Sequence, residues 1–447
     1  MKLSIENQSV MNSPTFVYGV ATASSQIEGG ADSRLPCIWD TFCAKKGKIA
    51  DGSNGDEACN HHQLWKQDVD LIESLGVDAY RLSMSWPRVI NKDGQLNQQG
   101  LSFYIDLLDE LERRNIKPFV TFYHWDLPQH LEDQGGWLNR ETAYKFRDYV
   151  DLVSKALGER VFSYATLNEP FCSAYLGYEA GIHAPGLKSK KYGKKAAHHL
   201  LLAHGLAIQT LNKNCPNIKK GIVLNFTPCY PKTDSEADIT ATKIADDYFN
   251  QWYIKPIFDG QYPALIDQLD EEHKPDIVQG DLEIIATPID YLGVNYYTRA
   301  VYSASTEGYG FEEQPPQPPL TDIGWEIYPK AMTELLVSLN NLYDLPPIYI
   351  TENGMAAADK LKNGEVNDRD RIEYLQSHLN AVNSAILSGV DIRGYFAWSL
   401  MDNFEWAEGY TKRFGLVYVD YETQDRTIKK SGLAYRDFIT QRLALPI

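Results

Sequence analysis

Segments with the pattern of buried strands alternate with segments with the pattern of amphipathic helices along the chain, and this alternation constrains the fold most. The expected strands are short apolar runs rich in β-branched and aromatic residues, at 16–23, 78–86, 118–125, 161–169, 221–228, 289–297, 348–351 and 392–399. The expected helices lie at 60–75, 101–114, 140–157, 196–211, 238–249, 330–342, 369–388 and 431–442. Because crossovers through helices are right-handed and eight parallel strands close well, the pattern predicts an α/β fold consisting of a single (β/α)8 TIM barrel.

The length of 447 residues fits one such barrel with long βα loops at its carboxyl face. No change of composition separates domains, so we expect a flexible N-terminal leader at residues 1–12 and one barrel domain over residues 13–447. The loop at 303–329 contains a proline cluster and then Trp325. A linker is one interpretation, but barrel units continue on both sides, and we expect a wall over the barrel mouth.

Charge and composition exclude several classes of function. The formal net charge of −17 would repel nucleic acid and anionic membranes, so neither is an expected partner. The six cysteines are too few for a disulfide scaffold, and the spacing of Cys37, Cys43 and Cys59 with His61 and His62 fits no zinc pattern, so no metal is expected. The N-terminus lacks the apolar stretch of a secretory signal and no transmembrane run follows, which predicts a cytoplasmic protein.

Two of the expected strands end in a glutamate. Residues 347–354 read PIYITENG and residues 161–170 read VFSYATLNEP, so Glu352 and Glu169 each follow an apolar run and precede a turn. A buried strand tolerates a charge only where it emerges from the sheet. We therefore predict that the fold brings these two carboxyl groups face to face.

Other polar and aromatic residues follow the remaining strands. They are Gln26, Glu28, Arg81, His124, Trp125, Asn168, Asn225, Asn295, Tyr296, Tyr297, Trp398, Glu405 and Trp406. In a parallel barrel the active site lies at this carboxyl face. The set includes no phosphate-binding glycine loop, and no cofactor is expected. Carboxylates, amides and indoles suit a polyhydroxylated substrate, and a pair of glutamates suits cleavage of a glycosidic bond.

The two glutamates need different environments for this chemistry. Arg81, if it reaches Glu352, and the hydroxyl of Tyr297 would keep Glu352 ionised and make it the nucleophile. Glu169, flanked by Asn168 and apolar residues, would have a raised pKa and serve first as the acid and then as the base.

Simpler explanations exist for each residue taken alone. An isolated glutamate at a strand end is usually a solvated loop residue or an ion-pair partner. His124 alone is more often a structural histidine, and Arg81 alone is more often an ion-pair anchor. The combination of these residues at one face favours a catalytic site.

Seven stretches, in this order, resemble glycoside hydrolase family 1, the β-glucosidase family. They are FVYGVATASSQIEG at 16–29, YRLSMSWP at 80–87, TFYHWDLP at 121–128, TLNEP at 166–170, NYY at 295–297, ITENG at 350–354 and WSLMDNFEWAEGYTKRFG at 398–415. The resemblance implies a retaining β-glucosidase with Glu169 as acid/base and Glu352 as nucleophile. The two carboxyl groups should then lie about 5 to 5.5 Å apart.

The resemblance also implies the residues that contact the substrate. The terminal sugar would be held by Gln26, His124, Asn168, Glu405 and Trp406, with Tyr297 beside Glu352 and Trp398 beneath the ring. Trp125, Asn295 and Phe414 are expected to complete this site. Phe171, Cys172, Leu176 and Trp325 are expected to face the leaving group.

Glu405 narrows the class of substrate. Its carboxylate would repel a phosphate dianion but would accept hydrogen bonds from two neutral hydroxyls, which favours unphosphorylated aryl or alkyl glucosides and short β-linked oligosaccharides such as cellobiose. β-Galactosides and β-fucosides also remain compatible. Three alternatives stay open, namely a 6-phospho-β-glucosidase, a transglycosylating glycosidase and a non-catalytic sugar-binding barrel. The sequence gives no indication of the oligomeric state.

Overall fold

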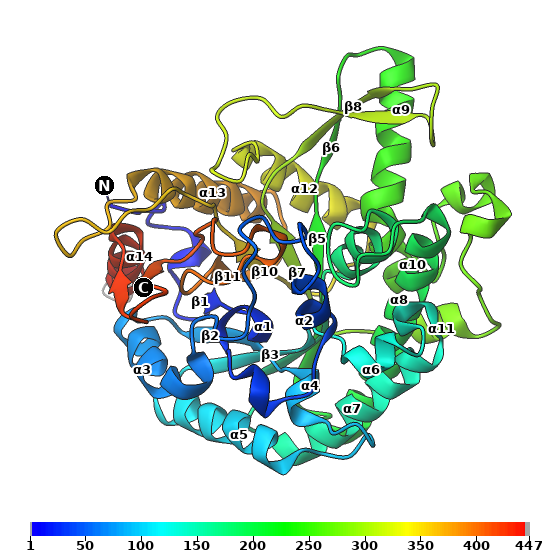
Figure 1. Ribbon diagram of the computed structural model, residues 1–447. Helices are drawn as coiled ribbons and strands as arrows, with labels where there is room; N and C mark the ends of the chain where they lie inside the picture. The colour runs from blue at the N-terminus through cyan, green and yellow to red at the C-terminus, as the bar shows by residue number, and fades with distance from the viewer. Residues whose placement is uncertain (1, 443–447) are drawn as a thin grey trace.

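The computed structural model describes residues 2–442 and contains a closed barrel of parallel strands at its centre (Figure 1). The barrel strands are β1 (Val17–Ala21), β2 (Ala79–Ser83), β3 (Lys117–Tyr123), β4 (Ser163–Asn168), β5 (Lys219–Phe226), β7 (Tyr291–Tyr296), β10 (Ile348–Asn353) and β11 (Ile392–Trp398). Their order around the barrel is β1-β11-β10-β7-β5-β4-β3-β2. Barrel strands that follow one another along the chain are therefore adjacent, and β11 closes the barrel against β1. The predicted (β/α)8 barrel is confirmed.

Helices surround the strands as an outer ring (Figure 1). The ring contains α3 (His61–Ser74), α5 (Gln98–Arg113), α7 (Glu141–Leu157), α8 (Lys190–Asn214), α10 (Trp252–Asp259), α11 (Asp281–Ile285), α12 (Pro329–Leu342), α13 (Arg369–Leu387) and α14 (Lys430–Arg442). Helix α7 shows why these segments were predictable. Its buried residues include Phe146, Val150, Val153 and Leu157, whose spacing places them on one side of the helix, and Gly158 ends the helix with a φ of 60°.

The barrel interior is filled by aromatic side chains. The rings of Phe119 and Phe396 have centroids 4.8 Å apart, and both residues are buried. Gly19 makes room for this packing, because a Cβ at that position would lie 2.3 Å from the ring of Phe396. The barrel is therefore closed below the site by packed side chains, and its loop face remains for function.

Two segments differ from the sequence-based expectation. The segment 238–249 forms a helix, α9 (Glu236–Asp246), but this helix packs against a small sheet and projects beyond the ring (Figure 1). The loop at 303–329 is not entirely irregular, because it contributes to that sheet. The sheet consists of β6 (Cys229–Pro231), β8 (Ala300–Ala304) and β9 (Phe311–Gln314).

The N-terminal segment, expected to be a flexible leader, packs against the barrel. Leu3 and Met11 are buried, and the hydroxyl of Tyr18 donates to the carbonyl oxygen of Met11 over 3.1 Å. The backbone N–H of Ser4 donates to Oε1 of Gln376 on α13 over 2.9 Å. The segment buries apolar side chains, which its polar composition in the sequence does not indicate.

Short elements lie in the loops between strands and helices. They include α1 (Ser24–Ile27), α2 (Ile38–Cys43), α4 (Trp86–Val89), α6 (Gln129–Glu132), the π-helices η4 (Cys172–Glu179) and η5 (Asp247–Gln251), and the antiparallel pair β12 (Val417–Val419) and β13 (Arg426–Ile428).

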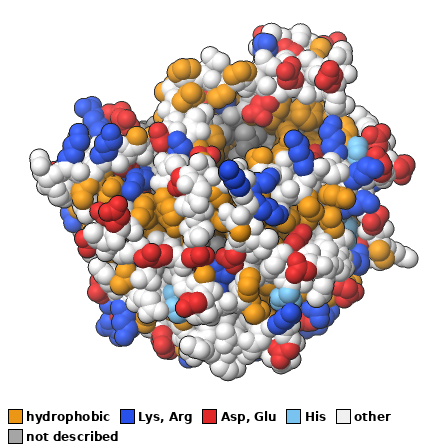
Figure 2. All heavy atoms as spheres, viewed as in Figure 1, with side chains coloured by type: hydrophobic (Ala, Val, Ile, Leu, Met, Phe, Trp, Pro, Cys, Tyr) orange, Lys and Arg blue, Asp and Glu red, His pale blue; other side chains and the backbone are white. Residues whose placement is uncertain are grey.

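On the face seen in Figure 2, Lys and Arg side chains lie among Asp and Glu side chains. Within residues 2–442, no helix combines the length and the apolarity that crossing a membrane requires.

Candidate active site

Glu169 and Glu352 lie at the carboxyl ends of two barrel strands. Glu169 directly follows β4, and Glu352 is the penultimate residue of β10, where it is paired with Asn295 of β7. Both side chains belong to buried residues, with exposed fractions of 5% for Glu169 and 3% for Glu352. Buried carboxyl groups require hydrogen-bond partners, and the neighbouring strands supply them.

A chain of hydrogen bonds connects the two carboxyl groups. The guanidinium of Arg81 donates through Nη1 to Oε1 of Glu352 and through Nη2 to Oδ1 of Asn168, each over 2.7 Å. Nδ2 of Asn295 donates to the same Oδ1 of Asn168 over 3.1 Å and to Oε1 of Glu169 over 2.6 Å. The side chains predicted from the ends of β2, β4, β7 and β10 therefore meet in one network.

The partners of Glu352 suit a charged acceptor. Its Oε1 accepts from Arg81, and its Oε2 accepts from the hydroxyl of Tyr297 over 2.6 Å. A guanidinium and a hydroxyl that both point at the oxygens stabilise the carboxylate form. Burial and the neighbouring carboxylates hold the pKa of Tyr297 well above its usual value, so its proton stays in this hydrogen bond.

Glu169 has a different environment. Burial and the negative charge of Glu352 raise its pKa to about 8, although the hydrogen bonds from Asn295 and Cys172 lower it. The raised pKa favours the protonated form of Glu169, while Glu352 is held by a cation. This contrast between two carboxyl groups is what separates an acid from a nucleophile.

The amide of Asn168 fixes the protonation of His124. Because Oδ1 of Asn168 accepts from Arg81 and Asn295, its Nδ2 must be the donor to Nε2 of His124, 3.1 Å away. Burial and the charge of Arg81 hold the pKa of His124 well below its usual value, so the ring is neutral and carries its proton on Nδ1. That Nδ1 is buried and has no hydrogen-bond partner within residues 2–442.

Gln26 and Glu405 lie side by side. Nε2 of Gln26 donates to the carbonyl oxygen of Phe404 over 3.0 Å and to Oε2 of Glu405 over 3.3 Å. Oε1 of Gln26 is buried without a partner in the described part of the chain. Burial, together with the charge of Glu352, raises the pKa of Glu405 to about 8.

Aromatic rings form the remaining walls. On one side the ring of Trp406 lies close to two other rings, with a centroid distance of 4.7 Å to Trp125 and of 5.9 Å to His124. The ring centroids of Trp398 and His124 lie 6.0 Å apart. On the other side Trp325 and Phe414 lie 5.3 Å and 6.1 Å from the ring of Tyr297. The second half of the 303–329 loop thus reaches the site through Trp325.

The backbone is strained at three of these residues. Trp125, Glu169 and Trp406 have φ angles of 76°, 48° and 51°, in the left-handed region that residues other than glycine rarely adopt. Such strain persists only where the surrounding structure enforces it, and it is concentrated at functional sites. The strain here coincides with Glu169 and with two of the indole rings.

Two residues among the polar strand ends, Tyr296 and Glu28, do not belong to the site. The hydroxyl of Tyr296 donates to the carbonyl oxygen of Tyr328 over 2.6 Å, and its ring lies 5.9 Å from that of His378 on α13. Glu28 follows α1 and accepts hydrogen bonds from Nε of Arg88, over 2.9 Å, and from the hydroxyl of Tyr104. Its role is structural, because a strand-end position does not determine the direction of the side chain. No cluster of His, Cys, Asp or Glu that could hold a metal ion occurs among residues 2–442.

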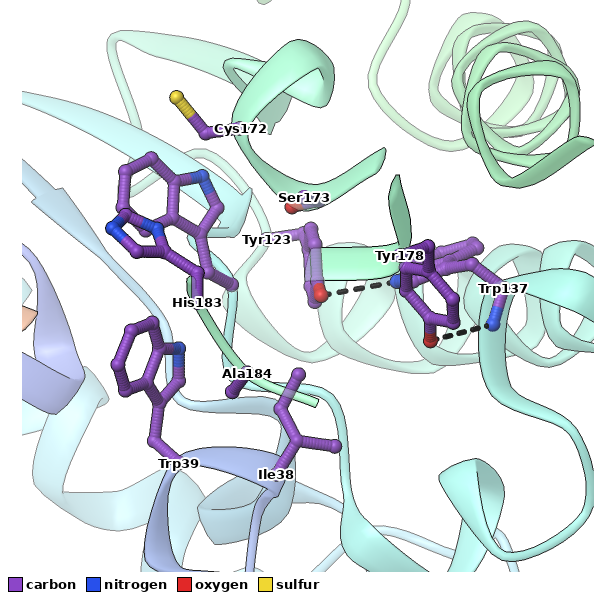
Figure 3. A pocket seen from close by; sticks show the side chains of 10 residues that line it. Ile38, Trp39, Tyr123, Trp137, Cys172, Ser173, Tyr178, His183 and Ala184 are labelled. Atoms are coloured by element: carbon purple, nitrogen blue, oxygen red, sulfur yellow. Dashed lines mark hydrogen bonds between the residues drawn. The ribbon is translucent and has the colours of Figure 1, made fainter. Parts of the chain in front are cut away.

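Two hydrogen bonds to side chains of the network were not expected from the sequence. Oγ1 of Thr351 donates to Oδ1 of Asn295 over 2.7 Å, and Sγ of Cys172 donates to Oε2 of Glu169 over 3.2 Å. Cys172 also lines a narrow space beside Trp125, Trp39 and His183. In the view of Figure 3 the sulfur of Cys172 points away from the other labelled side chains.

Comparison with known proteins identifies the family of the chain. The sequence model of Glycosyl hydrolase family 1 matches residues 11–443, and the chain belongs to this family. A β-glucosidase from Agrobacterium sp. is 45% identical over 428 residues, which cover 94% of this chain and 93% of that protein. A bifunctional β-D-glucosidase/β-D-fucosidase from Bifidobacterium breve is 45% identical over 462 residues, which cover 96% of this chain and 98% of that protein.

The fold of a relative in the same family has been determined by crystallography. The crystal structure of the family 1 β-glucosidase from Exiguobacterium antarcticum B7 superposes with a TM-score of 0.94 at 42% identity, with 100% of each chain covered. The expectation of a family 1 barrel is confirmed.

Proposed function

We propose that this protein is a retaining β-glucosidase that removes terminal β-D-glucosyl residues with Glu169 as acid/base and Glu352 as nucleophile. The observation that carries the proposal is the unequal environment of the two buried carboxyl groups. Glu352 accepts from Arg81 and Tyr297, whereas burial and the charge of Glu352 hold Glu169 in its protonated form.

The site residues divide the reaction between them. In the first step an oxygen of Glu352 forms a bond to the anomeric carbon, the glycosidic bond breaks, and the proton of Glu169 passes to the departing alcohol. In the second step Glu169 takes a proton from water, whose oxygen attacks the anomeric carbon and breaks the bond to Glu352. Arg81 and Asn295 hold the two carboxyl groups in place throughout.

Two unpartnered polar atoms support a sugar as the substrate. Within the described residues, Nδ1–H of His124 lacks an acceptor and Oε1 of Gln26 lacks a donor. Hydroxyl groups both donate and accept, so a sugar ring that lies near Trp398 and Trp406 can satisfy both atoms. We propose that Asn168, Glu405 and the indoles complete this binding site, and that Trp125, Trp325 and Phe414 line it.

The preferred substrates follow from the charge of the site. Glu405 lies close enough to Glu169 and Glu352 for their charges to raise its pKa, and the cation of the network, Arg81, is already paired. Because Arg81 is paired with Glu352, it is not free to bind a phosphate dianion, so we propose aryl and alkyl glucosides and short oligosaccharides as substrates. The relative from Bifidobacterium breve is named as a glucosidase and fucosidase, which supports a tolerant glycone site.

The decisive experiment replaces Glu352 by alanine. We expect the loss of hydrolysis of 4-nitrophenyl β-D-glucoside by about 10⁴-fold or more, because the covalent step is removed. Added azide should restore part of the turnover and give the α-glucosyl azide. Glu373→Ala, at an exposed position of α13, is the matched control and should behave as wild type. Near-normal turnover in Glu352→Ala would refute the role of Glu352.

Three comparisons test the alternatives. Faster cleavage of the 6-phosphorylated aryl glucoside than of the plain glucoside would indicate a 6-phospho-β-glucosidase. Glucosyl transfer to added alcohol or sugar as the main reaction would indicate a transglycosylating enzyme. Binding of glucose without turnover of any aryl glycoside would indicate a sugar-binding barrel.

A further inference from the structure

The thiol of Cys172 lies against the carboxyl group of Glu169. Cys172 is the first residue of the π-helix η4, and its backbone N–H donates to the carbonyl oxygen of Glu169 over 2.9 Å. Its Sγ lies 3.2 Å from Oε2 of Glu169, in the geometry of a hydrogen bond from the thiol. With 8% of the residue exposed, this contact is shielded from most of the solvent.

The other oxygen of Glu169 is restricted to one role. Oε1 accepts from Nδ2 of Asn295 over 2.6 Å. The amide of Asn295 cannot be reversed, because its Nδ2 also donates over 3.1 Å to Oδ1 of Asn168, an acceptor whose identity is fixed by the hydrogen bond from Arg81. Oε1 therefore faces an N–H donor in both protonation states of Glu169. The transferable proton must reside on Oε2, the oxygen that Cys172 contacts.

A thiol can serve Oε2 in both states. It is a weak donor and a weak acceptor, and a rotation about one bond changes one role into the other. Burial and the negative charges of Glu169 and Glu352 hold the pKa of Cys172 well above its usual value, so it stays a thiol. A valine of similar size could do neither, and a serine could do both.

We propose that Cys172 is a positioning residue for acid/base catalysis, which donates to Oε2 when Glu169 is ionised and accepts from Oε2 when Glu169 is protonated. The inference rests on the proposed glycosidase function. In the first step the proton on Oε2 passes to the glycosidic oxygen, and the S–H group then turns to donate to the new carboxylate. In the second step Oε2 takes a proton from the attacking water, and the thiol turns back. Cys172 keeps its own proton throughout.

The test compares Cys172→Val with Cys172→Ser. Loss of the donor destabilises the ionised form of Glu169 more than the neutral form, because hydrogen bonds to charged acceptors are the stronger ones. In Cys172→Val the basic limb of the pH profile of kcat/KM should therefore shift to higher pH by about 0.5 pH unit. In Cys172→Ser it should stay within about 0.3 pH unit of wild type, because the hydroxyl keeps both roles. Cys215→Val, a buried cysteine between α8 and β5 at the opposite face of the barrel, is the control and should not move the limb.

A second readout does not depend on turnover. The S–H stretching band of Cys172, isolated as the infrared difference between wild type and Cys172→Ser, should change its position with pH at the titration of Glu169. The titration itself can be followed by carbon-13 NMR of glutamate-labelled protein. If the wild type cleaved no aryl glucoside, the proposed function would fail, but these spectra would still test the contact.

The outcomes separate a positioning role from a packing role. The proposal is supported if the basic limb of the kcat/KM profile shifts to higher pH in Cys172→Val and stays near its wild-type position in Cys172→Ser. An unmoved limb in Cys172→Val, or equal changes in both variants, overturns it. An S–H band whose position does not change when Glu169 titrates also overturns the proposal. If Cys172→Val does not fold, the same comparison is made with Cys172→Ala, which removes the donor without adding volume.

Discussion

Replacing Glu352 by glutamine should lower the pKa of Glu169 by about two pH units. Burial is the first cause of the raised pKa of Glu169, about 8, and the charge of Glu352 is the second. Two charges about 5 Å apart, the separation expected of a retaining pair, interact by about 3 kcal/mol at an effective dielectric constant of about 20, which corresponds to about two pH units. Glutamine keeps the shape of the side chain and removes only the charge.

The same loss of charge occurs during the proposed reaction. Once Glu352 is bonded to the sugar, it no longer repels the ionised form of Glu169. The pKa of Glu169 should then fall from about 8, so that the group that was the acid becomes a base for the attacking water. The Glu352→Gln variant is thus a stable imitation of the intermediate's charge.

The assay is carbon-13 NMR of protein labelled at the glutamate carboxyl carbon, with the signal of Glu169 assigned from Glu169→Gln. We expect the titration midpoint of Glu169 to fall from near 8 in the wild type to near 6 in Glu352→Gln. A midpoint that is equal in both proteins would refute the argument, because burial alone would then account for the raised pKa.

Three further predictions concern stability and leaving groups. Because the pKa of Glu405 is raised, the folded state holds a proton that the unfolded chain releases, so the free energy of unfolding falls as pH rises from about 4.5 to about 8. Glu405→Gln should therefore raise the Tm measured by calorimetry by roughly 3 °C at pH 8 and by less at pH 5. Glu169→Ala should slow the hydrolysis of methyl glucoside far more than that of dinitrophenyl glucoside, because only the poor leaving group needs a proton, and equal losses in stopped assays would contradict this. A chain that starts at Ser13 loses the buried Leu3 and Met11 and should melt about 3 °C lower or more, whereas an unchanged Tm would show that the segment is dispensable.

The barrel could be predicted because each of its segments carries its own periodicity. The apolar residues of α7 recur at helical spacing and Gly158 follows them, so the helix was evident without any tertiary information. Although β8 and β9 form a local antiparallel pair, the sheet of β6, β8 and β9 was not predicted, because its strands are three to five residues long and β6 pairs with β8 across about seventy positions of sequence. Such pairing leaves no local signal.

The site could be predicted as a set of strand ends, but not as a set of contacts. Glu169 and Glu352 were evident because each is a charge at the end of an apolar run. Glu28 has the same kind of position, yet α1 directs it to Arg88 and Tyr104. The contact of Cys172 with Glu169 depends on where the chain turns into the π-helix η4. Side-chain direction after a strand depends on the loop, and residue type alone does not give it.

The most direct test of the two-glutamate account is the site of a trapped intermediate. The protein would be treated with an activated 2-deoxy-2-fluoro-β-glucoside, digested with protease, and its peptides analysed by mass spectrometry. The account predicts one fluoroglucosyl group on the peptide that contains Glu352, attached to that carboxyl group. A label on Glu169 or on any other residue would contradict it.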